Sequence, residues 1–369
     1  MMLPGRRRTM LMGFDENTER EKRKDEHVRL ALLDDRLPHS HFDLLTFVHH
    51  SLPNLGWGDV NLQVVLPDLD LKSPLYINAM TGGSGKTGKI NAELAKIAKA
   101  TGMAMGVGSQ HAGLRNESLA DTYRIVRRNN PEGTIFANVG ADVPLDFALN
   151  AIEMLEANAL QIHLNAPQEL IMPEGERDFT GWLSQIEKII KRVKIPVIVK
   201  EVGFGMSRNT LRLLKEIGVQ YLDISGRGGT NFIGIENRRR ERQEYDYLRG
   251  WGQTTPISLL EAQEYMSDMT IFASGGIRNP LDAVKCLSLG AKAIGLASPI
   301  LRILQKEGLE RAIEEINRWH EQLRTIFTML GARNMEELCA CPLVITGEVR
   351  EWCEVRGIDI SLIAQRGNM

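Results

Sequence analysis

The sequence predicts an α/β protein in which eight parallel strands close into a barrel surrounded by helices. Three observations carry this prediction. From Ser73 onward, apolar or β-branched runs alternate with amphipathic stretches, the units recur roughly every 25 to 40 residues, and eight of them follow in order. The alternative is an open doubly wound sheet, which usually has fewer strands and a glycine-rich dinucleotide turn after its first strand.

The elements of the predicted barrel follow directly from this alternation. The strand candidates are 74–80, 103–108, 134–140, 159–165, 196–202, 220–226, 270–276 and 292–298. The helical patterns are Lys89–Ala100, Leu145–Ala157, Trp182–Arg192, Arg208–Ile217, Leu281–Leu289 and Leu309–Leu330. Gly102, Gly218 and Gly290 stand between a helix and the next strand, where a left-handed residue commonly ends a helix.

The predicted organisation is a barrel with an extension at each end. Residues 1–72 form an N-terminal arm with a cationic helix (about Glu19–Leu33), a His-rich loop (Pro38–Ser51) and an irregular link; the first 18 residues show no periodic pattern. Residues 73–331 form the barrel and 332–369 a C-terminal appendage. The segment Gly226–Thr254 is Gly-rich and then strongly charged, which is typical of a mobile lid over a barrel mouth.

Composition excludes several functions. The chain has 369 residues, 43% hydrophobic, with a formal net charge of −2, so no broad basic field is available for nucleic acid or a membrane surface. Neither an apolar run of about 18 residues nor a signal-peptide pattern occurs, and a cytoplasmic protein is expected. Four cysteines do not suggest a disulfide framework, and Cys339-Ala-Cys341 is one residue too short for a zinc half-site. Reduced structural thiols are expected.

The strand candidate 159–165 ends in a cluster of polar groups. Strand alternation sends Gln161, His163 and Asn165 to one face, and the turn that follows presents Gln168 and Glu169. Five hydrogen-bonding groups within so short a stretch indicate a functional site at the C-terminal end of a barrel strand. The alternative is a buried structural network in which every group is satisfied.

Two later strand ends indicate a phosphate site. The glycines of Gly275–Pro280 allow the backbone to approach a ligand closely, and a helix is expected to start at the end of this stretch. Ala297–Pro299 is a second expected helix start, one strand–helix unit later. Free amides at two helix starts beside the last two strands are the usual phosphate cradle of barrel enzymes. Ordinary helix capping is the alternative.

A third glycine-rich stretch, Met80–Thr87, has a composition typical of a P-loop. The motif requires Gly five positions before Gly85, and Met80 stands there. Nucleoside triphosphate binding is therefore not expected.

A phosphate at that place and a cation near one edge of a ring fit flavin mononucleotide (FMN). Lys200, at the end of the fifth strand, would stabilise negative charge on the pyrimidine side of a reduced flavin. The ring would be bordered by Thr81, Ser109 and Asn138. The alternative for Lys200 is a salt bridge to Glu201 or Asp223.

A second cationic group precedes the barrel. Arg23 and His27 are four residues apart on one helix face, with Lys24 beside them. Such a set is suited to a diphosphate, although a helix rich in Lys and Arg is more often simply solvated.

Seven motifs in order resemble the type 2 isopentenyl diphosphate isomerase family. The resemblance runs from about Arg20 to Glu348 and rests on Arg23–His27, Ala79–Gly83, Gly106–Gln110, Gln161–Asn165 with Gln168 and Glu169, Val199–Gly203, Ser225–Thr230 and Ser274–Arg278. It implies a flavin- and magnesium-dependent barrel that interconverts isopentenyl and dimethylallyl diphosphate. It also implies a homo-oligomer, a tetramer or an octamer.

The resemblance implies a role for each matching residue. The substrate would be bound by Arg23, Lys24, His27, Ser109, Gln110, His111 and Gln168. The residues in or beside the chemistry would be Gln168, His163, Asn165 and Lys200. Glu169 would ligate Mg²⁺, which also bridges diphosphate oxygens. The flavin would be held by Ala79, Met80, Thr81, Ser109, Asn138, Lys200, Ser225, Thr230, Gly275, Gly276, Ile277, Arg278, Ala297 and Ser298.

The implied reaction adds a proton at one end of an allylic unit and removes one at the other. No implied site residue is an acid of the needed strength, so the reduced flavin is the expected proton carrier, with Gln168 or the flavin itself as acceptor. The reaction is redox-neutral overall, and NADPH would serve only to reduce the cofactor.

Other flavin barrels fit less well. An oxidase or dehydrogenase of 2-hydroxy acids needs a His base in a loop after the sixth or seventh strand, and a nucleotide dehydrogenase needs a Cys there. Neither residue type occurs between Glu201 and Lys285. A non-catalytic phosphate-binding barrel is the remaining alternative, and the presence of Gln168, Glu169 and Lys200 together argues against it.

Overall fold

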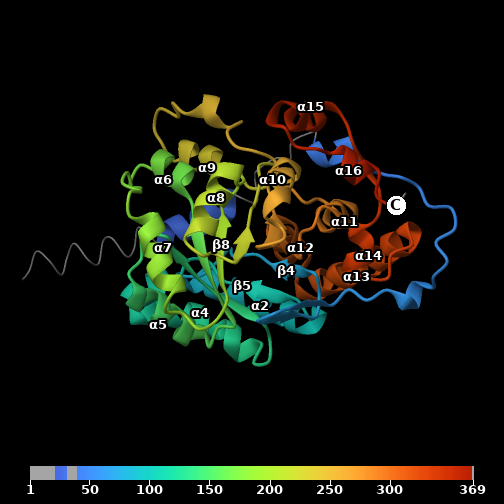
Figure 1. The fold of residues 1–369 in the computed structure, drawn as a ribbon. Coiled ribbons are helices and arrows are strands. Elements are labelled where there is room, and N and C mark those ends of the chain that lie inside the picture. Colours follow the sequence, from blue (N-terminus) through green and yellow to red (C-terminus); the bar gives the residue numbers. More distant parts are fainter. Residues whose placement is uncertain (1–20, 31–39, 368–369) are drawn as a thin grey trace, which may run out of the picture.

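The computed structural model describes residues 21–30 and 40–367, and its centre is a closed barrel of eight parallel strands (Figure 1). All eight predicted strands are present. They are β4 (Leu75–Ile77), β5 (Ala104–Gly106), β6 (Ile135–Gly140), β7 (Ala159–Leu164), β8 (Val197–Glu201), β9 (Tyr221–Asp223), β10 (Thr270–Ser274) and β11 (Ala293–Leu296). Each strand pairs with its neighbours in sequence, and β11 pairs with β4 to close the ring.

Helices surround this barrel, and the six predicted ones are all present. They are α2 (Gly85–Thr101), α5 (Leu145–Leu155), α7 (Trp182–Ile190), α8 (Arg208–Glu216), α11 (Pro280–Ser288) and α13 (Leu309–Leu330). Gly102, Gly218 and Gly290 have φ of 71°, 90° and 103°, as predicted for residues that end a helix. The structure adds α3 (His111–Arg115), α4 (Glu117–Asn129), α6 (Ala166–Ile171), α10 (Thr255–Glu261), η4 (Gln263–Tyr265) and α12 (Ser298–Glu307).

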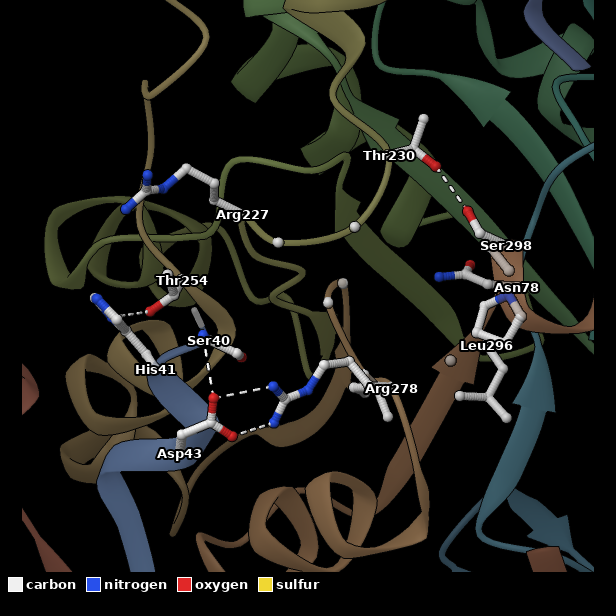
Figure 2. A pocket seen from close by; sticks show the side chains of 18 of the residues that line it. Ser40, His41, Asp43, Asn78, Arg227, Thr230, Thr254, Arg278, Leu296 and Ser298 are labelled. Atoms are coloured by element: carbon white, nitrogen blue, oxygen red, sulfur yellow. Dashed lines mark hydrogen bonds and ion pairs between the residues drawn. The ribbon is translucent and has the colours of Figure 1, made fainter. Parts of the chain in front are cut away.

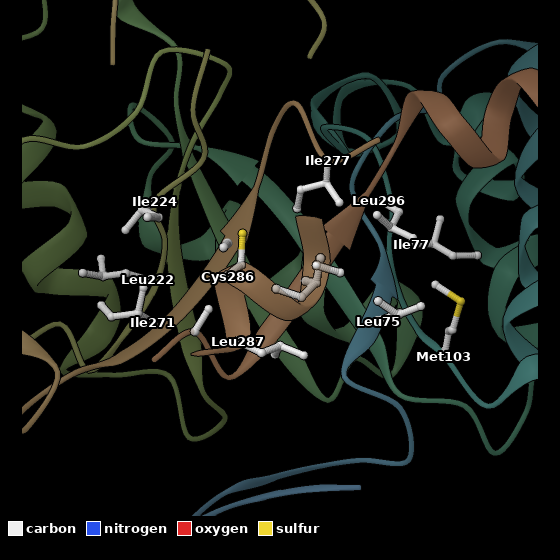
Figure 3. Packing of buried hydrophobic residues seen from close by; sticks show 14 of the residues in the cluster. Leu75, Ile77, Met103, Leu222, Ile224, Ile271, Ile277, Cys286, Leu287 and Leu296 are labelled. Atoms are coloured by element: carbon white, nitrogen blue, oxygen red, sulfur yellow. The ribbon is translucent and has the colours of Figure 1, made fainter. Parts of the chain in front are cut away.

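The core lies between the strands and the helices. Leu75 and Ile77 of β4 and Leu222 of β9 belong to this core with Leu287 and Cys286 of α11, and Figure 3 shows Leu222 beside Ile271 and Leu75 beside Met103. All four cysteines are free thiols, as expected. No helix in the described part of the chain has the length and apolar character needed to cross a membrane.

A buried hairpin closes the N-terminal end of the barrel. Its strands are β2 (Val64–Leu66) and β3 (Leu69–Leu71), which pair antiparallel. Their alternate side chains join the lowest inward-facing layer of the barrel, which includes Tyr76, Phe136 and Phe272. The sequence predicted an irregular link here, and the structure corrects it: three-residue strands are too short for periodicity to reveal them.

The two segments that flank the barrel meet each other. In the N-terminal segment η1 (His41–Leu44) leads into β1 (Leu45–Phe47), and η2 (Trp57–Asp59) follows. Strand β1 pairs antiparallel with β12 (Leu343–Ile345) near the other end of the chain. The C-terminal segment also contains α14 (Met335–Cys339), α15 (Gly347–Arg356) and α16 (Ser361–Ala364). In Figure 1 the blue N-terminal segment therefore lies beside the red C-terminal helices.

The segment expected to be a lid is folded. It contains α9 (Phe232–Arg238) and η3 (Asp246–Leu248), and a bridge between Arg227 and Thr254 joins its ends. Residues 21–30 of the cationic arm are helical, as predicted. The expected ends of that helix, and the first 18 residues, lie outside the described part.

Candidate functional site

Two adjoining cavities occupy the C-terminal end of the barrel. The cavity of about 630 Å³, here called the glycine cavity, is lined by the loops after β9, β10 and β11 and by η1 and Gly347. The cavity of about 320 Å³, here called the cationic cavity, is lined by helix 21–30, by the ends of β5 to β8 and by α6. Chemistry at the C-terminal ends of strands is the rule for such barrels.

Backbone packing shapes the glycine cavity. Gly275 and Gly276 have φ of 88° and 70°, and a Cβ on Gly275 would lie 2.3 Å from the carbonyl oxygen of Gly226. No other residue fits, so the two loops touch through their backbones. Beside them α12 begins at Ser298, and its N-cap residue, Ala297, provides no side-chain cap, which leaves backbone amide groups for an anion. Thr230 Oγ1 lies 3.0 Å from Ser298 Oγ at this opening (Figure 2).

The other predicted helix start is occupied. Asn279 caps α11, and the backbone N–H of Arg278 donates to Asp282. The Arg278 guanidinium donates hydrogen bonds to Asp282 and to Asp43 of η1, and these hydrogen bonds raise its pKa. Figure 2 shows the pair with Asp43. Arg278 therefore lines the cavity, but its side chain also fastens the N-terminal segment to the barrel.

A polar layer of inward-facing side chains lies beneath both cavities. Its members are Asn78, which directly follows β4, and one residue from each of the other seven strands: Gly106, Asn138, Gln161, Lys200, Asp223, Ser274 and Gly295. Two of its positions are glycines, and neighbouring side chains occupy the place of their Cβ atoms: a Cβ on Gly295 would lie 2.6 Å from Tyr76 Oη, and one on Gly106 would lie 2.8 Å from Gln161 Oε1. The buried amide of Gln161 has no hydrogen-bond partner among the described residues. A buried layer of polar groups that includes an unsatisfied amide suits a flat polar ligand lying on it.

His163 faces the cationic cavity as a neutral imidazole. Asn138 Nδ2 donates to the carbonyl of Val107, so Asn138 Oδ1 is the acceptor for His163 Nδ1–H at 2.8 Å. The other ring nitrogen, Nε2, is then an acceptor. Burial, with the nearby cations of Lys200 and Lys24, lowers the pKa of His163 to about 3.

Glu236 is a buried carboxylate that holds two of the predicted site residues. The side chain is 0% exposed and lies 2.8 Å from His27 Nε2, while Gln168 Nε2 donates to the same oxygen at 2.9 Å. Arg239 donates to the second oxygen at 2.6 Å. Burial alone would raise the pKa of Glu236, but these partners lower it to about 2. The sequence did not single out Glu236, because it lies in a charged segment that reads as solvated.

Glu169 lies at the opening of the cationic cavity. Asn165 Nδ2 donates to its Oε1 at 2.8 Å, and the backbone N–H of Glu176 donates to Oε2 at 3.0 Å. Nowhere in residues 21–30 and 40–367 do three or more His, Cys, Asp or Glu gather in a metal-binding group. A metal ion here would have one carboxylate and complete its shell with water and ligand oxygens, which is how Mg²⁺ is commonly held.

Most of the predicted residues gather at these two cavities. The cationic cavity is lined by Arg23, Lys24, His27, Ala79, Met80, Ser109, His111, Asn138, His163, Asn165, Gln168, Glu169 and Lys200. The glycine cavity is lined by Thr230, Gly275, Gly276, Ile277, Arg278, Ala297 and Ser298.

Three predicted ligands line neither cavity. Thr81 is buried and donates to Asn91 of α2. Gln110 is fully buried and donates to the carbonyl of Ala151. The Ser225 hydroxyl accepts the N–H of Gly203 and holds a loop. Position at a strand end does not tell on which side of the backbone a side chain points, and the binding roles of these three residues stay predictions.

Fold and site together define a parallel-barrel enzyme with a glycine-lined cavity beside a cationic one. Residues 171–343 match the family model for FMN-dependent dehydrogenases. The fold is similar to that of a mutant flavocytochrome b2 with benzoylformate (TM-score 0.62, 19% identity, 81% of this chain and 76% of that chain). It is also similar to that of a mandelate oxidase mutant with the monooxide FMN adduct (TM-score 0.61, 14% identity, 86% and 92%).

Relatives found by sequence have a much higher sequence identity to this chain than these solved structures have. Two proteins named isopentenyl-diphosphate delta-isomerase, from Staphylococcus aureus strains JH9 and Newman, are each 51% identical to this chain. The alignments span 342 residues, which are 93% of this chain and 98% of each relative. The chain belongs to the isopentenyl-diphosphate delta-isomerase family. The resemblance found in the seven motifs is therefore confirmed.

Proposed function

We propose that this enzyme interconverts isopentenyl and dimethylallyl diphosphate with reduced FMN and Mg²⁺. One observation carries the proposal. Helix 21–30, which lies far from the barrel strands in sequence, brings Arg23, Lys24 and His27 into the same cavity as Glu169 and Lys200. One side of that cavity provides basic side chains for a diphosphate and Glu169 as a metal ligand. The other side provides Lys200, at the end of β8.

FMN fits the two cavities and the layer beneath them. Its phosphate would occupy the glycine cavity at the uncapped start of α12, near Thr230 and Ser298. Its ring would lie on the polar layer, with Lys200 at the pyrimidine edge and the amide of Gln161 below. Bound reduced flavin would supply the proton that the alkene takes up.

The substrate diphosphate would be bound by the cationic helix. The Arg23 guanidinium forms an ion pair with Glu174 at 3.2 Å, and a bound phosphate would replace that carboxylate as its anionic partner. His27 Nε2 lies 2.8 Å from the buried Glu236 carboxylate, which fixes the orientation of the imidazole beside the phosphate. Glu169 would bind Mg²⁺ and, through it, the diphosphate oxygens.

The hydrocarbon end would lie near neutral groups. His163 accepts at Nε2 and is neutral at physiological pH, so it orders water or substrate without supplying a strong acid. Gln168 donates its Nε2–H to Glu236, so its carbonyl oxygen is the group that would accept the departing proton, unless the bound flavin did so. Asn165 holds Glu169 in place.

The fold alone also fits 2-hydroxy acid oxidation. That chemistry needs a basic His in the loops after β9 or β10, and the segment from Glu201 to Lys285 contains none. The 51% identity of the isomerases over most of the chain favours isomerisation.

An anaerobic assay tests the proposal. Isopentenyl diphosphate is incubated with the protein, FMN, Mg²⁺ and NADPH, and each is omitted in turn. We expect dimethylallyl diphosphate only when FMN, Mg²⁺ and a reductant are present, and dithionite should replace NADPH. Turnover without FMN, or a colourless protein that binds none, would overturn the proposal. The homo-oligomer stays a prediction, which light scattering on the purified protein tests.

A further inference from the structure

The barrel contains a buried carboxylate that the proposed mechanism does not use. Asp223 ends β9, is 0% exposed, and lies in the polar layer beneath both cavities. Its Oδ2 lies 3.7 Å from the ammonium of Lys200, which lines the cationic cavity. The same oxygen accepts from Asn78 Nδ2 at 3.3 Å, and Asn78 lines the glycine cavity. Asp223 therefore connects the linings of the two cavities.

The surrounding donors fix this carboxylate. Tyr76 Oη donates to Oδ2 at 2.7 Å, while Ser274 Oγ and the backbone N–H of Ser225 donate to Oδ1 at 2.7 and 3.1 Å. The Nδ2 group of Asn78 and the backbone N–H of Ser225 can only donate, so both carboxylate oxygens are acceptors. Such a set gives Asp223 a single orientation, and the ion pair gives Lys200 one as well.

Lys200 has few other contacts that would hold it. Its ammonium donates to the backbone carbonyl of Glu201 at 3.0 Å and is almost fully buried. The Glu201 carboxylate does not share the cation, because it accepts the N–H groups of Phe204 and Gly205 at 2.6 and 2.7 Å. Asp223 is thus the carboxylate that both orients the ammonium and offsets its charge.

We propose that Asp223 is a positioning residue for the flavin: it holds the Lys200 ammonium under the pyrimidine edge and limits the positive charge that the ring experiences. The inference rests on the proposed function, since it requires FMN on the polar layer. In a buried site the carboxylate cancels much of the field of the ammonium, because the two charges are weakly screened. Without Asp223 the site would favour the negatively charged reduced flavin more strongly.

The test measures the midpoint potential of the bound flavin in the holoenzyme. Asp223→Asn keeps the shape and removes the charge. We expect the preference for reduced over oxidised FMN to increase at least about tenfold, which is about 30 mV upward for a two-electron couple.

Glu201→Gln is the matched control, since it makes the same substitution next to Lys200 on the other side of β8. Burial raises the pKa of Glu201 to about 7. Both variants are therefore measured about one pH unit above that value, so that each substitution removes a charge. We expect Glu201→Gln to change the preference less than about threefold.

A double-mutant cycle shows whether Asp223 acts through Lys200. Lys200→Met protein has no ammonium for Asp223 to orient or to offset. Asp223→Asn should then change the preference less than about threefold. The inference would be overturned if Asp223→Asn changed the midpoint potential equally with and without Lys200, or left it unchanged in the protein that retains Lys200.

A second variant covers the case in which Asp223→Asn does not fold. Tyr76→Phe removes one hydrogen-bond donor from Oδ2, so more of the negative charge of the carboxylate is left to offset the Lys200 ammonium. The preference for reduced flavin should therefore fall by about twofold or more. An unchanged preference in that variant would refute the inference. If the wild-type protein binds no FMN, the proposed function is refuted. If the wild-type protein turns over and Asp223→Asn leaves the midpoint potential unchanged, only the role of Asp223 is refuted.

Discussion

Replacing Glu236 with Gln removes the charge of a buried carboxylate and keeps its size. The partners of Glu236 lower its pKa from 4.5 to about 2, a difference equivalent to roughly 3 kcal/mol. Hydrogen bonds to a charged group are worth about 1.5–3 kcal/mol each and do not add simply. We therefore expect Glu236→Gln to lower the free energy of unfolding at pH 7 by about 2–3 kcal/mol.

The pH dependence follows from the direction of this shift. Because the folded-state pKa lies below the unfolded value, the stabilisation is complete above pH 4.5 and is lost as the pH falls toward about 2. The difference between the wild-type protein and Glu236→Gln should therefore be constant from pH 7 to about pH 5 and shrink at lower pH.

Urea unfolding of the two proteins at several pH values measures this difference. Glu174→Gln is the matched control, since Glu174 also binds Arg239, at 2.6 Å, but is 43% exposed. That substitution should cost less than about 1 kcal/mol. A loss below about 1 kcal/mol for Glu236→Gln, or equal losses for both variants, would refute the reasoning. Because Glu236 also holds His27 and Gln168, its substitution should raise the KM for isopentenyl diphosphate, whereas an unchanged KM would separate the carboxylate from substrate binding.

Three further changes test other parts of the site. Glu169→Gln should abolish Mg²⁺-dependent turnover and leave the flavin bound, and normal activity would remove the metal assignment. Lys200→Ala should weaken FMN binding or slow flavin reduction in titrations and stopped-flow spectra; unchanged affinity and rate would contradict its placement. Gly295→Ala inserts a methyl group 2.6 Å from Tyr76 Oη, so it should destabilise the fold by about 1–3 kcal/mol and reduce FMN retention. A Gly295→Ala protein with wild-type thermal stability would show that the layer has spare room.

The barrel could be predicted from the sequence because its elements are long enough to show a pattern. A helix such as Leu309–Leu330 carries several turns of apolar spacing, and short apolar strands recur between such helices. The hairpin Val64–Leu71 has strands of three residues, and the pairing of Leu45–Phe47 with Leu343–Ile345 joins segments that are distant in sequence. Neither leaves a periodic signal.

The site could be predicted to the level of strand ends. Parallel strands bring their C-terminal ends together, so His163, Lys200 and Ser298 were expected on one surface, and they line adjoining cavities. Side-chain direction depends on φ and ψ beyond the strand, which is why Gln110 turned out to be buried. The importance of Glu236 depends on tertiary burial, and in the sequence it is one carboxylate among many in a charged segment.

The pairing of β1 with β12 makes both ends of the chain responsible for one wall of the glycine cavity. His41, just before β1, lies 2.8 Å from Thr254 Oγ1 and 3.1 Å from Glu348 Oε2, just after β12. A deletion that removes either strand leaves the other without its pairing partner. Limited proteolysis should therefore report on cofactor retention, since nicking either flank would release the same prosthetic group.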